Sequence, residues 1–368
     1  MTPADLSRTV LRVVRHVVER GELLGDTHER TVSERNVVEG TAVERNVVER
    51  ILVERPRAGG RGDYACNAAL QLAGAAGRPP REVARLLADR LVREPGIADV
   101  EITGPGFLNL TLDGDDQAVV REVFAAGTRY GHVSGPTGQV VQLHLRPELR
   151  AAVRCDAVRR ILRSQGALVR TSCTEPLPEV WAALGIHVDA LGTPPGPEGL
   201  AFTTPVPAPE QIPALGPDAT RWALLHPAAQ DRPRMTDRHL VQGESNPLFR
   251  VRYAHARSRA LSRNAADLGF HAEPHPAPRE AARQDLLAAL ADHPRVLAQA
   301  AEHRAPDRLT RHLVQVADAL LDFQYAVLPQ GDEKPEAAHR ARLALAEAAG
   351  TVLAGGLSLL GIDAPEYL

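Results

Sequence analysis

The sequence predicts three parts: an α+β unit at the N-terminus, a small α/β unit in the middle and an all-α bundle at the C-terminus. Three patterns carry this prediction. Apolar and polar residues alternate on both sides of Gly104-Pro105-Gly106, as in a strand-turn-strand. A strand-helix-strand pattern follows between 139 and 172, and beyond 218 leucine, valine and alanine recur at helical spacing. The length of 368 residues suffices for two or three domains.

The N-terminal unit is predicted to contain helices and two strands, and to end near residue 130. Apolar residues from Leu6 to Val18 share one stripe, which indicates an amphipathic helix over 6–24. Further helices are expected at 63–76 and 80–91, with strands within 97–112. The stretch 32–55 repeats itself with a period of ten residues, and we interpret it as a duplicated charged insertion.

The middle unit is predicted as strand 139–145, helix 151–165 and strand 167–172, which together suggest a small parallel sheet within 138–173. The proline- and glycine-rich stretch 174–217 is interpreted as a linker around one short segment near Trp181. A helical bundle over 218–368 should follow. Its expected helices are 218–226, 246–267, 279–290, 294–302, 307–328 and 335–360, with Asp307 as an N-cap after Pro306.

Composition limits the function classes. Hydrophobic residues make up 44% and charged residues 24% of the chain, as in soluble globular proteins. We see no run of about 18 apolar residues and no apolar signal segment, so we expect a cytoplasmic protein without a membrane span. The three cysteines show no paired spacing, so we expect no metal site and no disulfide framework. A net charge of -3 still permits a local basic face.

Two segments of the N-terminal unit resemble arginyl-tRNA synthetases. They are Gly62-Asp63-Tyr64-Ala65-Cys66-Asn67 with the following Ala68 to Leu72, and Gly104-Pro105-Gly106-Phe107-Leu108-Asn109. The resemblance implies a domain that binds the tRNA D-loop, through Tyr64, Asn67, Gln71, Phe107 and Asn109. An aromatic face can stack on a splayed base and an amide can read its edge. From the residues alone, packing and capping at a helix start would be the alternative role for Tyr64 and Asn67.

The C-terminal part resembles the same family. Val251-Arg252-Tyr253-Ala254-His255-Ala256-Arg257 and the ending from Gly355 to Glu366 are similar to its DALR-type anticodon-binding domain. The resemblance implies that the helix lies near tRNA, so we expect phosphate contacts rather than only a solvated face. The residues expected to make them are Arg250, Arg252, Tyr253, His255, Arg257, Arg259 and Arg263.

The middle unit resembles a degenerate Rossmann-like remnant of the synthetase catalytic domain. The stretch from Leu149 to Leu162 is similar to the helix that follows the family's HIGH motif, but the preceding residues run from Leu143 to Glu148 without glycine. A carboxylate there would repel phosphate. The basic cluster of this helix could shield the surface left by a deleted domain or follow the acceptor arm. Its members are Arg150, Arg154, Arg159, Arg160 and Arg163.

The only lysine is Lys334, so the mobile lysine of a KMSK-type loop is missing. Arg232, Arg234 and Arg238 could carry positive charge instead, but a planar guanidinium binds differently from an ammonium group. We therefore expect no catalytic residues, no cofactor and no ATP binding.

The resemblance and these absences together predict a non-catalytic tRNA-binding protein that recognises the elbow and the anticodon arm, with arginine tRNA favoured. It would act as an accessory or regulatory factor, with a tRNA-modifying or aminoacyl-tRNA-using enzyme as a candidate partner. Two alternatives stay open. One is an arginine–tRNA ligase with residual or partner-completed activity, and the other is a protein-interaction scaffold that does not bind tRNA.

Overall fold

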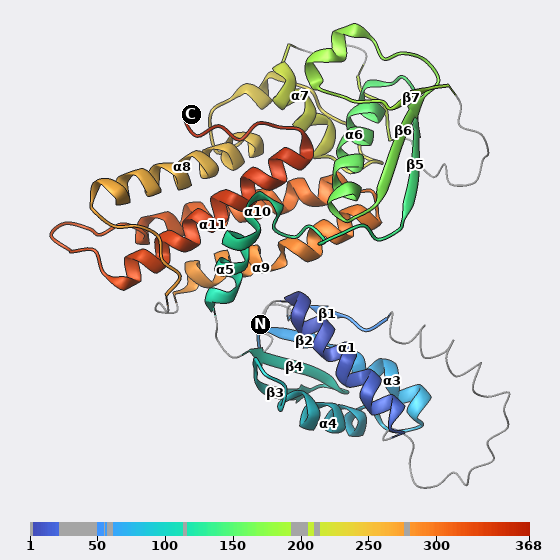
Figure 1. The fold of residues 1–368 in the computed structure, drawn as a ribbon, viewed down its shortest axis with the longest axis vertical. Coiled ribbons are helices and arrows are strands. Elements are labelled where there is room, and N and C mark those ends of the chain that lie inside the picture. Colours follow the sequence, from blue (N-terminus) through green and yellow to red (C-terminus); the bar gives the residue numbers. More distant parts are fainter. Residues whose placement is uncertain are drawn as a thin grey trace. The chain divides into compact units, whose positions relative to one another are not determined.

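The chain forms two compact units in this computed structural model, Met1–Ala118 and Val119–Leu368 (Figure 1). The structure describes residues 3–21, 50–54, 56, 62–112, 116–192, 205–209, 214–275 and 280–368. The predicted ten-residue repeat therefore lies outside the described residues up to residue 49.

In the first unit, helices pack against a four-stranded antiparallel sheet with the order β1-β2-β4-β3. The strands are β1 (Val53–Glu54), β2 (Tyr64–Cys66), β3 (Ile97–Thr103) and β4 (Phe107–Leu112). The helices are α1 (Pro3–Glu19), α3 (Ala68–Ala76) and α4 (Pro80–Leu91). At the turn between β3 and β4, Gly106 has a φ of 142°, and an added Cβ would lie 3.0 Å from the carbonyl oxygen of Pro80. Glycine is required there because the turn lies against α4.

The predicted helix over 63–76 is wrong in its first residues. Tyr64 and Cys66 pair with Leu110 and Leu108 of β4, and both point into the core as alternate residues of a strand. The helix begins only at Ala68. A three-residue strand beside a helix is too short to show its period in the sequence.

The second unit begins earlier than predicted. Helix α5 (Asp116–Ala126) belongs to it, because Val119, Val120 and Val123 are buried in the same core as the C-terminal helices. The boundary between the units therefore lies between Ala118 and Val119, in the first turn of this helix, and not near residue 130 as predicted.

A parallel sheet with the order β5-β6-β7 forms one side of the second unit (Figure 1). Helix α6 (Leu149–Ser164) connects β5 (Val140–Leu145) to β6 (Leu168–Cys173). The third strand, β7 (Ala190–Leu191), and the 3₁₀ helix η2 (Glu179–Leu184) lie in the stretch predicted as a linker. Helix η2 contains Trp181, where a short segment was predicted, but the linker prediction is wrong for β7, because Asp189 anchors the chain to the sheet. Its Oδ2 accepts hydrogen bonds from the backbone N and the hydroxyl of Thr171 at 2.6 and 2.7 Å.

The predicted helical bundle is present. Its members are α7 (Gly216–Leu225), α8 (Pro247–Asp267), α9 (Ala281–Glu302), α10 (Pro306–Phe323) and α11 (Ala337–Leu360), with short 3₁₀ helices η3 (Asp237–Leu240) and η4 (Gln324–Ala326). The two helices predicted at 279–290 and 294–302 are one, because α9 continues through Pro294 with Leu290 and Leu297 buried on either side. Asp307 is not an N-cap. It lies in the first turn of α10, where its carboxylate pairs with Arg154 and Arg311.

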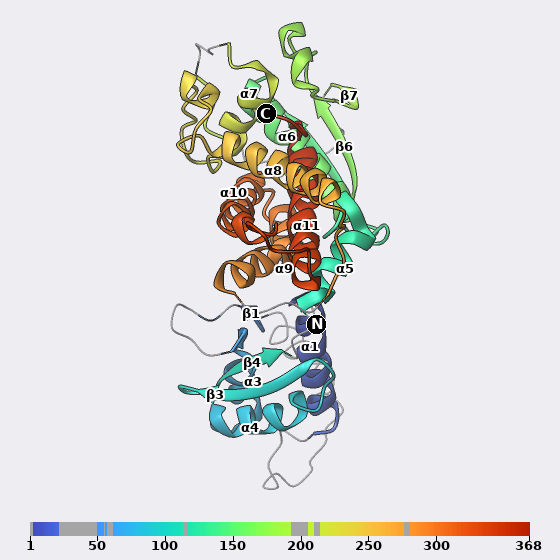
Figure 2. The ribbon, with the colours of Figure 1, turned by 90° about the vertical axis from the view of Figure 1, so that its left-hand side faces the viewer.

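Helix α11 lies among α8, α9 and α10 (Figure 2). It is the one described helix long and apolar enough to cross a membrane, with a mean hydropathy of 1.7, and 72% of that apolar window is buried in the protein. The sequence shows no run of about 18 apolar residues here because the charged Arg342 and Glu347 interrupt it, and the burial of α11 is that of a core helix. One of these glycines, Gly356, brings α11 against Leu313 of α10, where an added Cβ would lie 2.4 Å from a methyl carbon.

The buried carboxylate of Asp156 joins α6 to the bundle. It accepts hydrogen bonds from Arg159 at 2.6 Å and from Arg221 of α7 at 2.7 Å, and Arg221 also donates to the carbonyl of Leu360 in α11 at 2.7 Å. Burial alone would raise the pKa of Asp156, but Arg221 and the neighbouring arginines lower it below its ordinary value. Asp156 is therefore charged in the folded protein.

We predict that Asp156→Asn lowers the free energy of unfolding at neutral pH by about 3–5 kcal/mol, because two buried guanidinium groups lose their counter-charge. The folded pKa of Asp156 is depressed, so this stabilisation is present above the ordinary aspartate pKa and is lost as the pH falls through the folded value. Urea denaturation at several pH values measures it. The exposed Asp285→Asn on α9 is the control, and equal stability of the two variants at neutral pH would contradict the prediction.

Candidate nucleic-acid interface

A carboxylate caps the N-terminus of α6. The side-chain oxygens of Glu148 accept hydrogen bonds from the backbone N of Arg150 at 3.0 Å and of Ala151 at 2.8 Å. They also accept one from the backbone N of Ala208 at 2.8 Å, in the stretch after β7. Free N–H groups at a helix N-terminus form a ready site for an anion. Here the protein's own carboxylate already fills that position.

The histidine that precedes this turn, His144, is held by the sheet. Its Nδ1 lies 2.9 Å from the hydroxyl of Ser172 on β6, and Gln142 donates to the same hydroxyl at 3.0 Å. His144 thus joins two neighbouring strands, in agreement with a structural role.

The basic cluster of α6 is largely interior, so three of its members do not present a surface that could follow an acceptor arm. Arg150, Arg154 and Arg159 are buried, with exposed fractions of 0%, 3% and 8%. Arg154 pairs with Asp307 at 3.6 Å and Arg159 with Asp156. The side chains of Arg160 and Arg163 remain 34% and 45% exposed.

Arg150 is the most fully enclosed of these cations. Its guanidinium donates to five backbone carbonyls at 2.7–3.1 Å, which belong to Val206, Leu224, Pro227, Ala228 and Asp231. Burial, with a contribution from Arg154, lowers the pKa of Arg150 to about 10, so the group is charged at neutral pH. The side chain thus gathers three separate segments around the start of α6.

Each arginine predicted to contact tRNA from α8 has a partner within the chain. Arg250 pairs with Asp318 at 2.9 Å, Arg252 with Asp218 at 3.3 Å and Arg259 with Glu366 at 3.3 Å. Arg257 donates to Gln324 at 2.7 Å, and Arg263 lies 4.3 Å from the ring centroid of Tyr367. His255 is buried, and its Nδ1 donates to the carbonyl of Pro365 at 2.9 Å. Partners on α7, α10 and the C-terminal segment thus engage much of this helix's positive charge, which its own periodicity could not show.

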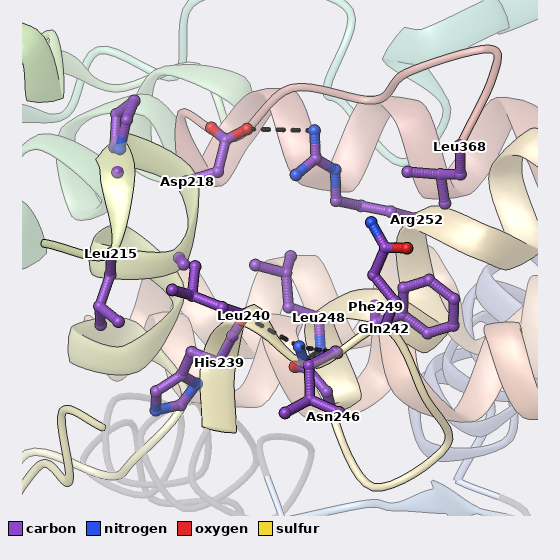
Figure 3. Close-up of a pocket in the computed structure, with 14 residues that line it drawn as sticks. Leu215, Asp218, His239, Leu240, Gln242, Asn246, Leu248, Phe249, Arg252 and Leu368 are labelled. Atoms are coloured by element: carbon purple, nitrogen blue, oxygen red, sulfur yellow. Dashed lines mark hydrogen bonds and ion pairs between the residues drawn. The ribbon is translucent and has the colours of Figure 1, made fainter. Parts of the chain in front are cut away.

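Tyr253 is the member of the predicted α8 set that presents an open ring. It is 41% exposed and stacks on Phe249, with 5.7 Å between ring centroids and 14° between planes. Phe249 also lines a pocket of about 320 Å³ between the start of α7, residues 239–242 and the start of α8 (Figure 3). Asp218 and Arg252 pair across one side of this pocket, and Leu368 lies beside them. Aromatic rings next to polar groups can receive a nucleobase.

The five residues predicted to bind the D-loop do not share one open surface. Tyr64 and Asn109 are buried, each 5% exposed, and Asn109 donates to Thr103 at 2.7 Å. Asn67 holds β1, because its Oδ1 accepts from the backbone N of Leu52 at 2.7 Å. Phe107 is 40% exposed and Gln71 is half-buried. The predicted use of Tyr64 as an open stacking face is therefore corrected, since its ring belongs to the core.

Comparison with known proteins finds similarity to one family at both ends of the chain. Residues 34–112 match the arginyl tRNA synthetase N terminal domain, and residues 251–368 match the DALR anticodon binding domain. The arginine–tRNA ligase of Frankia alni is 27% identical over 576 residues, covering 100% of both chains. Because this chain has 368 residues, more than a third of those aligned positions have no residue here.

Two solved structures share the fold. The arginyl-tRNA synthetase of Thermus thermophilus has a TM-score of 0.65 at 16% identity, covering 89% of this chain and 99% of that one. The arginyl-tRNA synthetase of Plasmodium falciparum has a TM-score of 0.61 at 9% identity, covering 90% and 98%.

We predict that Glu148→Ala lowers the free energy of unfolding by about 1–2 kcal/mol, because three backbone N–H groups lose their acceptor. Glu148→Gln should lose less, since its amide keeps one oxygen. Urea denaturation measures both, and the exposed Glu175→Ala serves as a control. A Glu148→Ala protein as stable as the wild type would show that the carboxylate does not support the turn.

Proposed function

We propose that this chain, which is related to arginyl-tRNA synthetases, is a tRNA-binding protein without ligase activity. The observation that carries the proposal is the carboxylate of Glu148 on the N-terminal amides of α6. Formation of an aminoacyl-adenylate requires a site for the ATP phosphates and stabilisation of their charge. A carboxylate in that position repels phosphate.

Two further observations support the absence of catalysis. Lys334, the only lysine, is exposed between η4 and α11, in the helical bundle and away from α6 in the sequence. More than a third of the positions aligned with the Frankia ligase have no residue here, so this chain has far fewer residues than that ligase from which to form a catalytic domain. ATP binding is therefore not part of the proposed function.

Binding of tRNA is supported by the two matched domains and by the stacked pair of Tyr253 and Phe249 beside the pocket of Figure 3. Two RNA-binding units on one chain raise the overall affinity, because binding by the first raises the effective concentration of the second. The relatives favour arginine tRNA as the ligand. We propose an accessory or regulatory role in the cytoplasm, in which the bound tRNA is presented to a tRNA-modifying or aminoacyl-tRNA-using enzyme.

A second candidate function is an arginine–tRNA ligase completed by a partner chain. The relation to arginine–tRNA ligases favours it. ATP–pyrophosphate exchange with arginine separates the two candidates. Exchange by the purified chain, alone or with a copurifying partner, would establish a ligase and contradict our proposal.

We predict that the protein binds native tRNA, with affinity that falls as salt is raised, and that Tyr253→Ala weakens binding about 5- to 100-fold. The reason is the loss of base–aromatic stacking, worth about 1–3 kcal/mol per base. Fluorescence anisotropy with native tRNA measures the affinity, and sequencing of the bound fraction identifies the species. Tyr325→Ala is the matched control, since Tyr325 is 72% exposed elsewhere on the bundle and should be neutral. Absence of tRNA binding by the wild type would refute the proposal.

A further inference from the structure

A second and larger pocket lies between the end of α7 and the start of α8. Its volume is about 620 Å³, nearly twice that of the pocket in Figure 3. Its lining includes three arginines and two histidines and no carboxylate. We call it the arginine pocket, and its basic residues are His226, Arg232, Arg234, Arg238 and His239.

The three arginines of this pocket differ from those of α6 and α8 because their guanidinium groups have no partner among the described residues. Within the described ranges, no ion pair or hydrogen bond involves the guanidinium group of Arg232, Arg234 or Arg238, and all three residues are exposed. Asp231 and Asp237 are neighbours in sequence but do not line the pocket. The positive charge of the three pocket arginines is thus available to a ligand, whereas the arginines of α8 already have partners within the chain.

The other polar residues of the lining add hydrogen-bond donors to the pocket. Burial lowers the pKa of His226, and Arg311 and His239 lower it further against the opposing effect of Asp307. A neutral imidazole can still donate one hydrogen bond to an anion. Thr236 and Ser245 contribute hydroxyl groups to the same lining.

The backbone that carries these arginines is held in place. Arg150 donates to the carbonyls of Pro227, Ala228 and Asp231 at 2.7–3.1 Å, which fixes the start of the segment. Further along, Nε2 of His239 donates to the carbonyl of Arg234 at 2.8 Å. Asn246 then donates to the carbonyls of His239 and Val241, each at 2.9 Å. A backbone that is already held in place loses less conformational entropy when a ligand binds.

We propose that the arginine pocket binds phosphate groups, and that its occupant is the sugar–phosphate backbone of RNA. Guanidinium groups match phosphate oxygens with two parallel hydrogen bonds. The pocket is open and much larger than one phosphate, so it suits neighbouring phosphates of a chain. Identifying the RNA as tRNA rests on the proposed function, whereas recognition of phosphate does not.

The test compares two triple variants of the full chain. The pocket variant carries Arg232→Gln, Arg234→Gln and Arg238→Gln. The control variant carries the same charge change at exposed arginines elsewhere in the second unit, Arg129→Gln, Arg170→Gln and Arg308→Gln. Affinity for native tRNA is measured against salt, because each lost phosphate contact lowers the slope of log K against log salt by about 0.7–0.9.

We expect the pocket variant to bind tRNA at least about tenfold more weakly, and the slope of log K against log salt to become less steep by about 2. The control variant should have an affinity and a slope close to those of the wild type. Wild-type tRNA binding with an unchanged slope and affinity in the pocket variant would overturn the inference and leave the proposed function standing. Circular dichroism and thermal unfolding show whether the variant remains folded.

Pyrophosphate and ATP separate the two sources of phosphate. If RNA is the occupant, titration calorimetry should show at most weak binding of either compound. Tight binding of ATP or pyrophosphate that is lost only in the pocket variant, with tRNA affinity unchanged, would overturn RNA as the occupant. If the wild type fails to bind tRNA, both the proposed function and RNA as the occupant of the pocket are refuted. In that case, pyrophosphate binding that is lost only in the pocket variant would still support a phosphate-binding site.

Discussion

The buried guanidinium of Arg150 is the interaction on which the second unit depends. It has no carboxylate within direct hydrogen-bonding distance among the described residues and is held by backbone carbonyls, so removing it would take a donor away from five of them. Those carbonyls come from the stretch around Val206, from the end of α7 and from the segment that follows it. One side chain of α6 therefore connects the small sheet to the bundle and also positions the arginine pocket.

The same helix shows how charge is distributed in this protein. At its N-terminus Glu148 occupies the amides, and along its length Asp156 and Asp307 neutralise arginines that are shut off from solvent. On α8, partners from other elements engage the guanidinium groups. The arginines after α7 are the contrast, because their side chains are exposed and have no such partner among the described residues. Local density of arginine is thus a poor guide to where an anion binds, and the availability of each charge is a better one.

Much of the architecture could be predicted from the sequence, because long helices and alternating strands carry strong periodic signals. The strand at Tyr64 and the strand at Ala190 could not, since each is held by pairing with a distant strand and is too short for a pattern. The continuation of α9 through Pro294 also depends on tertiary packing. The motifs indicated the family, but not the accessibility of their residues. Nothing local in the sequence shows that Tyr64 is buried or that Arg252 faces Asp218.

The carboxylate of Glu148 at the N-terminus of α6 limits which substitutions the protein can tolerate there. It bonds both to its own helix and to Ala208, so it is now part of the connection between α6 and the segment before α7. A substitution that reopened the amides to phosphate would at the same time loosen that connection. Under the function proposed above, a single substitution toward nucleotide binding would therefore cost stability before it gave any activity. A fold that relies on this internal anion would need coordinated changes at several positions to free the amides for phosphate.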